Sequence, residues 1–87
     1  GHPAVRLAAV IGKPDTLRTE IVKAFVVLQD GFAGNPGLAA EIRDWVKNRL
    51  SMHEYPREIE FVAELPLTTS GKVIRRLLRD QEIAKAS

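Results

Sequence analysis

The chain has 87 residues, 45% of them hydrophobic, and its 13 basic and 11 acidic residues give a net charge of +2. A chain of this length buries roughly 60% of the surface that its unfolded form exposes, so we expect one small domain and no complete enzyme. It contains no cysteine, which excludes disulfides and thiolate zinc sites and favours a cytoplasmic location. No apolar run is long enough to span a membrane, and the first residues lack the features of a signal peptide.

Two strands are predicted in the first third of the chain. Val5 to Ile11 is an apolar run with a single charge, and it is followed by the turn residues Gly12 to Asp15. Glu20 to Leu28 is rich in β-branched and aromatic residues and ends before Asp30-Gly31. Because the connection between these segments is short, we expect the two strands to be antiparallel.

A helix is predicted to begin at Asn35 and Pro36, since asparagine is a good N-cap and proline suits the first helical position. We expect it to reach about Leu50. Its apolar residues recur at intervals of three and four, which is typical of a buried stripe: Leu38, Ile42, Trp45, Val46 and Leu50.

The last third predicts one strand and one helix. Glu58 to Val62 alternates charged and apolar residues, as a strand with one solvated face does. A helix over about Val73 to Ala84 is expected to bury Val73, Ile74, Leu77 and Leu78 and to expose Arg75, Arg76 and Arg79. The acidic residues are expected on exposed faces.

These elements predict an α+β fold in which a small three-stranded mixed sheet is packed with helices. The strand, helix, strand succession should be parallel and right-handed. Two antiparallel strands and a helical crossover form part of a split βαβ unit, whose opening strand and helix would precede residue 1.

The segment Thr68 to Lys72 combines three hydroxyls, a glycine and a lysine directly before the last predicted helix. Its backbone and hydroxyl groups could face an anion, which would offset the unfavourable position of Lys72 at a helix N-terminus. Alternatively, Thr69 or Ser70 caps the helix, Gly71 relaxes a turn and Lys72 is an ordinary solvated lysine. The glycine spacing of a P-loop is absent.

The run Pro66 to Arg76, with its Thr-Thr-Ser-Gly-Lys core, resembles the last core motif of the adenylate-forming superfamily of acyl-CoA synthetases, adenylation domains and luciferases. The order of His2 to Val5, Ala8 to Asp15 and Lys23 to Leu28 is similar as well. The run Tyr55 to Val62 is more like the acyl-CoA synthetases, including those for short and medium chains, than the adenylation domains.

The resemblance implies that residues 1–87 are the mobile C-terminal lid domain, truncated at its N-terminus, without the large N-terminal domain and the hinge. In that family ATP and a carboxylic acid give an acyl-adenylate, and CoA then accepts the acyl group. Lys72 is implied as the catalytic residue for adenylation, acting by electrostatic positioning. Ser70 and Gly71 are implied as cofactor-binding neighbours, and the isolated chain is expected to be inactive.

The resemblance also implies Lys47 as a residue near the nucleotide end of CoA, although a solvated helix lysine is the alternative. The magnesium that accompanies ATP would bind to the large domain, and this chain offers no metal site. Lys72 is implied as an acetylation site for a protein acetyltransferase, reversed by a deacylase, because acetylation would remove its charge.

A different class of function is a nucleic-acid-binding module that uses the basic last helix. Arg75, Arg76 and Arg79 could contact phosphates, but acidic residues dilute their field and no stacking aromatics are interleaved. His2, His53 and Tyr55 form no cluster with metal-ligand spacing and no nucleophilic triad. We therefore expect neither nucleic acid nor a membrane as a partner.

Overall fold

A computed structural model of the chain describes residues 2–15, 17, 19–49 and 55–86. Its elements in chain order are β1 (Val5–Asp15), β2 (Thr19–Leu28), α1 (Pro36–Lys47), β3 (Glu58–Phe61) and α2 (Arg75–Ala86). The predicted α+β class with a three-stranded mixed sheet is confirmed.

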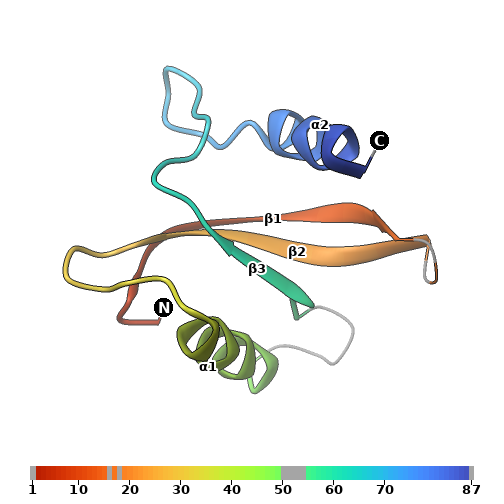
Figure 1. The fold of residues 1–87 in the computed structure, drawn as a ribbon. Coiled ribbons are helices and arrows are strands. Elements are labelled where there is room, and N and C mark those ends of the chain that lie inside the picture. The colour runs from red at the N-terminus through yellow and green to blue at the C-terminus, as the bar shows by residue number, and fades with distance from the viewer. Residues whose placement is uncertain (1, 16, 18, 50–54, 87) are drawn as a thin grey trace.

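The strands lie in the order β1-β2-β3, with β2 in the centre (Figure 1). β1 and β2 form an antiparallel hairpin, as predicted. β2 and β3 pair in parallel, also as predicted, and α1 connects them along the chain. The crossover helix is what allows β3 to run in the same direction as β2, since parallel neighbours need a long connection.

β1 is four residues longer than the predicted strand, because Gly12 to Asp15 continue the ladder instead of turning. Gly12 pairs with Val22, and Asp15 pairs with Thr19. Proline is compatible with this ladder because β1 is an edge strand, which pairs with a neighbour on one side only.

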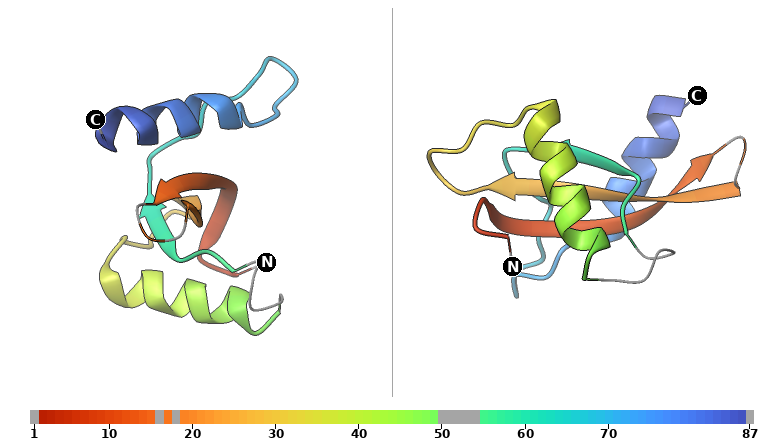
Figure 2. Two further views of the ribbon diagram at one scale, coloured as in Figure 1. Left: turned by 90° about the vertical axis from the view of Figure 1, so that its right-hand side faces the viewer. Right: turned by 90° about the horizontal axis from the view of Figure 1, so that it is seen from below.

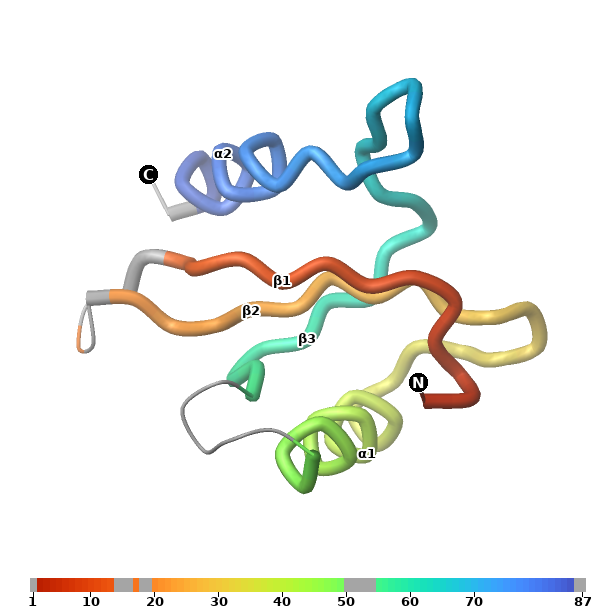
Figure 3. Tube along the Cα trace, turned by 180° about the vertical axis from the view of Figure 1, so that it is seen from behind, coloured from red at the N-terminus to blue at the C-terminus, as the bar shows by residue number. Residues whose placement is uncertain are grey.

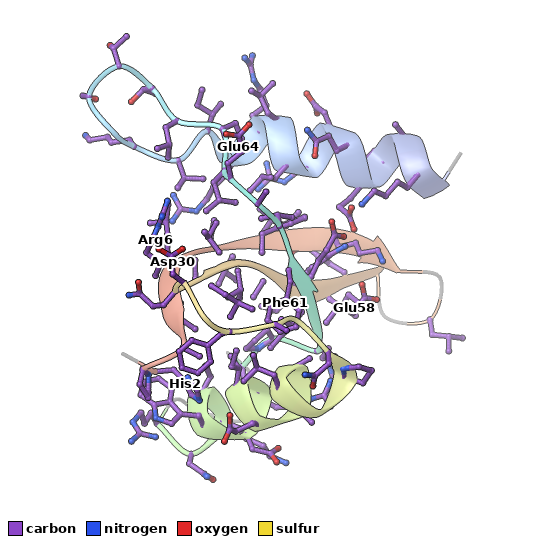
Figure 4. All side chains as sticks on the ribbon, turned by 60° about the vertical axis from the view of Figure 1, so that its left-hand side comes forward. His2, Arg6, Asp30, Glu58, Phe61 and Glu64 are labelled. Carbon is purple, nitrogen blue, oxygen red and sulfur yellow. The ribbon has the colours of Figure 1, made fainter. Side chains whose placement is uncertain are left out.

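The two helices cover opposite faces of the sheet (Figures 1 and 2). On the α1 side, the buried residues Ala24, Val26 and Ile42 form a cluster that Ile59 and Phe61 extend. Phe61 lies between the sheet and α1 in Figure 4, which also shows His2 beside that helix. On the α2 side, a second cluster consists of Ala9, Ile11, Phe25, Val27, Leu65 and Leu78. The sheet therefore separates two small cores.

α1 begins as predicted. The Asn35 side chain accepts a hydrogen bond of 2.8 Å from the backbone N–H of Leu38, and Pro36 is the first helical residue. Ile42 is buried, while Leu38, Trp45 and Val46 are half-buried, so the apolar stripe is confirmed for these residues. The helix ends at Lys47, and Leu50 lies outside the described residues.

α2 begins at Arg75, two residues later than predicted, because Val73 is held in an isolated β-bridge. Leu78 is buried as predicted, whereas Leu77 is 38% exposed and Val73 and Ile74 are only half-buried and precede the helix. The predicted exposure of the three arginines is confirmed.

The inner face of α2 continues from Leu78 to Glu82, which is only 2% exposed, so the expectation that acidic residues lie on exposed faces is wrong here. An acidic residue can occupy this buried position because the sheet beneath Glu82 presents charged partners. Lys23 from β2 is 5% exposed and donates a hydrogen bond to Glu82. A buried charge is tolerated when it is paired in this way.

Candidate functional site

The lysine-containing loop is the tip of a small hairpin between β3 and α2. Leu67 and Val73 form an antiparallel bridge at its base. Next to the bridge, the N–H of Thr68 donates to the carbonyl of Lys72 at 2.8 Å, and the N–H of Ile74 donates to the carbonyl of Pro66 at 2.9 Å. Figure 3 shows this loop projecting from the body of the molecule. The hairpin therefore presents a short tip at a fixed place.

The tip is closed by hydrogen bonds that converge on Thr68. Its carbonyl accepts from the N–H of Gly71 at 2.9 Å. Its hydroxyl accepts from the N–H of Lys72 at 3.1 Å and shares a hydrogen bond of 3.0 Å with the hydroxyl of Ser70. Gly71 has a φ of +86°, a left-handed conformation that glycine adopts without steric cost.

Lys72 itself is exposed, and none of the ion pairs found among the described residues involves it. It does not lie at a helix N-terminus as predicted, because α2 starts three residues later. The alternative in which Thr69 or Ser70 caps that helix is wrong for the same reason. The lysine side chain is thus free to reach a ligand outside this domain.

The loop has fewer donors for an anion than the sequence indicated. The N–H groups of Gly71 and Lys72 are both used inside the tip, and the Ser70 hydroxyl is engaged with Thr68. The Lys72 ammonium is the charged group that the tip leaves open to a negatively charged partner. An ammonium on a constrained backbone stabilises negative charge by position and needs no proton transfer.

Lys47 lies in a second, separate place. Its ammonium is 5.3 Å from the ring centroid of Tyr55, and the guanidinium of Arg57 is 5.8 Å from the same centroid. These residues line an open pocket of about 220 Å³ together with Arg43 and Asp44. Three cations and an aromatic ring in one pocket suit a ligand that combines phosphate with a planar base.

Sequence reasoning gave Lys47 as a candidate but missed the residues around it. Arg43 and Lys47 are four residues apart on α1 and therefore share one face of the helix. Tyr55 and Arg57 come from the segment before β3. Their place beside this face of α1 could not be predicted from the sequence, because it depends on the fold.

The remaining sequence candidates show no catalytic arrangement. The Nε2 atom of His2 is 3.4 Å from a Glu41 carboxylate, and its ring meets that of Trp45 edge-on at 5.8 Å. His53 lies outside the described residues. Within residues 2–15, 17, 19–49 and 55–86, no group of three or more His, Cys, Asp or Glu could hold a metal, and no helix could cross a membrane.

The arginines of α2 lack the aromatic partners of a nucleic-acid surface. Trp45 lies on α1, and Tyr55 packs beside that helix, whereas the arginines lie on α2 across the sheet (Figure 1). The nucleic-acid alternative therefore gains no support from the fold.

Comparison with known proteins places this geometry in a family. Residues 1–72 match the AMP-binding enzyme C-terminal domain. The chain is 52% identical over 82 residues to the acetyl-coenzyme A synthetase of Bacillus subtilis, which covers 94% of this chain and 14% of that protein.

Two crystal structures of acyl-CoA-forming enzymes contain the same fold. A Brucella canis acyl-CoA synthetase is matched with a TM-score of 0.95 and 60% identity, over 99% of this chain and 16% of that one. An anthranilate CoA ligase in complex with anthranoyl-AMP is matched with a TM-score of 0.89 and 40% identity, over 99% of this chain and 17% of that one.

The chain thus spans less than one fifth of the length of these relatives. The resemblance noted in the Thr-Thr-Ser-Gly-Lys motif is confirmed by sequence and by fold. This chain belongs to the AMP-binding enzyme C-terminal domain family, in the form that acyl-CoA synthetases contain.

Proposed function

We propose that this chain is the mobile C-terminal domain of an ATP-dependent, AMP-forming acyl-CoA synthetase, in which Lys72 promotes formation of the acyl-adenylate. The observation that supports this most directly is the position of Lys72, exposed at the tip of a hydrogen-bonded hairpin. Its ammonium would stabilise the charge that moves between the carboxylate and phosphate oxygens during adenylation.

The remainder of the active site would come from the large N-terminal domain that such enzymes contain. The relatives are roughly six times as long as this chain, and their extra length is sufficient for such a domain. ATP, its magnesium ion and the carboxylic acid would bind there, and this chain would approach them as a lid. The isolated chain would therefore be inactive.

CoA would be bound partly by the pocket around Lys47. That pocket lies on the α1 side of the sheet, whereas the Lys72 hairpin leads into α2 on the other side (Figure 1). When the Lys72 hairpin faces the adenylation centre, the pocket on the opposite side of the sheet faces elsewhere. Rotation between adenylation and thioester formation would turn the pocket toward the nucleotide end of CoA, which the pantetheine arm separates from the reacting thiol.

The experiment that tests the role of Lys72 measures the two half-reactions separately in the full-length enzyme. Lys72→Ala should lower acyl-adenylate formation, followed by pyrophosphate exchange, by about 100- to 1,000-fold. Thioester formation from preformed acyl-adenylate should be unchanged. Arg79→Ala is the matched control, since it removes another exposed cation. If Lys72→Ala retains full adenylation, the proposed function of this lysine is wrong.

We infer further that acetylation of Lys72 would regulate the enzyme. An exposed lysine on a projecting hairpin is accessible to a protein acetyltransferase and to a deacylase. Acetylation would neutralise the ammonium and so remove its electrostatic role. The Lys72→Arg variant should resist acetylation by a purified acetyltransferase and yet stay inactive in adenylation, because a guanidinium places its charge differently. Full activity of Lys72→Arg would contradict the positional requirement.

A further inference from the structure

We propose that Thr68 is a positioning residue for the adenylation half-reaction and acts on Lys72 through the Thr68 hydroxyl. This inference rests on the proposed function of Lys72. Of the residues in the tip, Thr68 bonds to each of the three residues before α2 that shape it: Ser70, Gly71 and Lys72.

The contact to Lys72 is reciprocal. The Thr68 N–H donates to the Lys72 carbonyl at 2.8 Å, and the Thr68 hydroxyl accepts from the Lys72 N–H at 3.1 Å. The two backbone groups of Lys72 are therefore both held by one residue. Because the peptide groups on either side of its Cα are fixed, the direction in which the lysine side chain leaves the loop is fixed as well.

The hydroxyl contributes something that the backbone of Thr68 does not. The backbone bond between Thr68 and the Lys72 carbonyl belongs to the base of the hairpin, next to the Leu67–Val73 bridge, and would survive loss of the side chain. Within the part of the chain that the structure describes, the Lys72 N–H, in contrast, has the hydroxyl as its one partner. Without the hydroxyl this N–H would turn to water, and the peptide group between Gly71 and Lys72 would lose its hydrogen bond, although the bond from the Gly71 N–H to the Thr68 carbonyl would remain.

Thr69 is a natural control for this effect. It is the same residue type, lies in the same tip and is exposed like Thr68, but no hydrogen bond of its side chain occurs among the described residues. Removal of its hydroxyl changes the composition of the loop in the same way without touching the Lys72 N–H.

The consequence for catalysis follows from the length of the lysine side chain. Its charged nitrogen lies at the end of four methylenes, so a small rotation of the backbone moves it by an ångström or more. A displacement of that size can cost about 100-fold in rate even when the chemistry is otherwise intact. The Thr68 hydroxyl is exposed and outside both cores, so its loss should leave the fold unchanged.

The test compares Thr68→Val, Thr68→Ser and Thr69→Val in the full-length enzyme, with Lys72→Ala alongside. Thr68→Val keeps the shape and removes the hydroxyl, and it should lower kcat of adenylation by about 10- to 100-fold with KM for ATP unchanged. Thr68→Ser keeps the hydroxyl and should therefore recover at least half of the loss in kcat, compared on a logarithmic scale. Thr69→Val should behave as wild type, and thioester formation from preformed acyl-adenylate should be unchanged in all three.

A second measurement follows the hydrogen bond itself. Amide hydrogen exchange of the peptide that contains Lys72 should quicken in Thr68→Val and remain slow in Thr68→Ser and Thr69→Val. The inference is overturned if Thr68→Val adenylates normally, or if Thr69→Val loses as much adenylation activity as Thr68→Val. It is also overturned if Thr68→Val raises KM for ATP with kcat unchanged, or if it slows both half-reactions alike. Normal adenylation by Thr68→Val with a loss in Lys72→Ala would reject the positioning role alone, whereas normal adenylation by Lys72→Ala would reject the proposed function.

Discussion

Lys23 donates a hydrogen bond to Glu82 across the interface between β2 and α2, and both side chains are almost fully buried. Lys23 also donates to Glu60 at 2.8 Å, and its ammonium lies 4.9 Å from the ring centroid of Phe25. A Glu82 carboxylate oxygen lies 2.9 Å from the ammonium of Lys85 on the same helix. α2 is therefore held to the sheet by Leu78 and by a group of linked charges.

Removal of the buried cation should be more costly than removal of the exposed one. Lys23→Met takes away the hydrogen bond from the sheet but leaves Glu82 with the ammonium of Lys85 at 2.9 Å and that of Lys13 at 3.8 Å, so the free energy of unfolding should fall by about 1–3 kcal/mol. Lys85→Met should cost about 1 kcal/mol or less, because the Lys85 side chain is 55% exposed. Urea unfolding of the 87-residue chain, followed by circular dichroism, measures both. Equal losses in the two variants would contradict the assignment of Lys23 as the buried anchor of α2.

The same charges make the stability depend on pH. Burial raises the pKa of Glu82, but Lys23 and Lys85 outweigh it and hold that pKa below the ordinary value of 4.5. The hydrogen bond from Lys23 likewise lowers the pKa of Glu60. A carboxyl with a lowered pKa in the folded state stabilises the fold above its unfolded pKa, and this stabilisation is lost as the pH falls through the folded value.

We therefore expect the urea midpoint of the chain to fall as the pH is lowered from 5 through about 4.5 and beyond. The Glu60→Gln/Glu82→Gln double variant should be less stable at neutral pH but should show a shallower decline over this range, since it has lost two of the groups that bind protons on unfolding. Parallel declines in the variant and the wild type would show that other carboxyls are responsible.

Gly71 in the tip and Gly31 in another loop share a left-handed backbone conformation. Gly71 has a φ of +86° and Gly31 a φ of +91°, and an added Cβ would meet nothing within 4 Å at either position. Alanine at each should therefore cost a similar amount through backbone strain alone, about 1–2 kcal/mol.

Only Gly71→Ala should also impair adenylation, because only that strain lies beside Lys72. Unfolding of the 87-residue chain gives the first quantity, and pyrophosphate exchange by the full-length enzyme gives the second. A comparable loss of adenylation in Gly31→Ala would mean that general destabilisation, and not the geometry of the tip, limits the reaction.

Much of the fold could be predicted because its signals are local. The Asn35-Pro36 start of α1 follows from neighbouring residues and is confirmed. The strand predicted at Glu58 to Val62 is found at Glu58–Phe61, but all four of its residues are half-buried, so the predicted solvated face is wrong. The extension of β1 through Pro14 could not be predicted, because it depends on β1 being at the edge of the sheet. The buried position of Glu82 depends on Lys23, which is 59 residues away in sequence and is joined to it only by folding.

For the candidate sites too, local sequence signals could be predicted and contacts that depend on the fold could not. The Thr-Thr-Ser-Gly-Lys motif made Lys72 a candidate from sequence, but the hydrogen bond from its backbone N–H to the Thr68 hydroxyl could be found only in the closed hairpin. The start of α2 was misplaced because the apolar residues Val73 and Ile74 fit a helical period, whereas the hairpin uses them in a bridge and a backbone hydrogen bond.

The pocket around Lys47 predicts a specific defect in the use of CoA. If its cations bind the phosphates at the nucleotide end of CoA, Lys47→Ala and Arg43→Ala should each raise KM for CoA about tenfold, the size expected for loss of one partly exposed charge-assisted hydrogen bond. The adenylation half-reaction needs no CoA and should be unchanged.

Arg49→Ala is the control for that experiment. Arg49 follows α1 closely in sequence, but its guanidinium lies 3.8 Å from the ring centroid of Trp45 and donates to the Trp45 carbonyl at 3.1 Å. It is not among the residues that line the pocket. Dephospho-CoA lacks the 3′-phosphate and so tests whether these cations bind that group. If Lys47 or Arg43 contacts the 3′-phosphate, the preference of the enzyme for CoA over dephospho-CoA should shrink in that variant and persist in Arg49→Ala. An unchanged preference in all three variants would place the nucleotide of CoA elsewhere and leave this pocket as ordinary solvated surface.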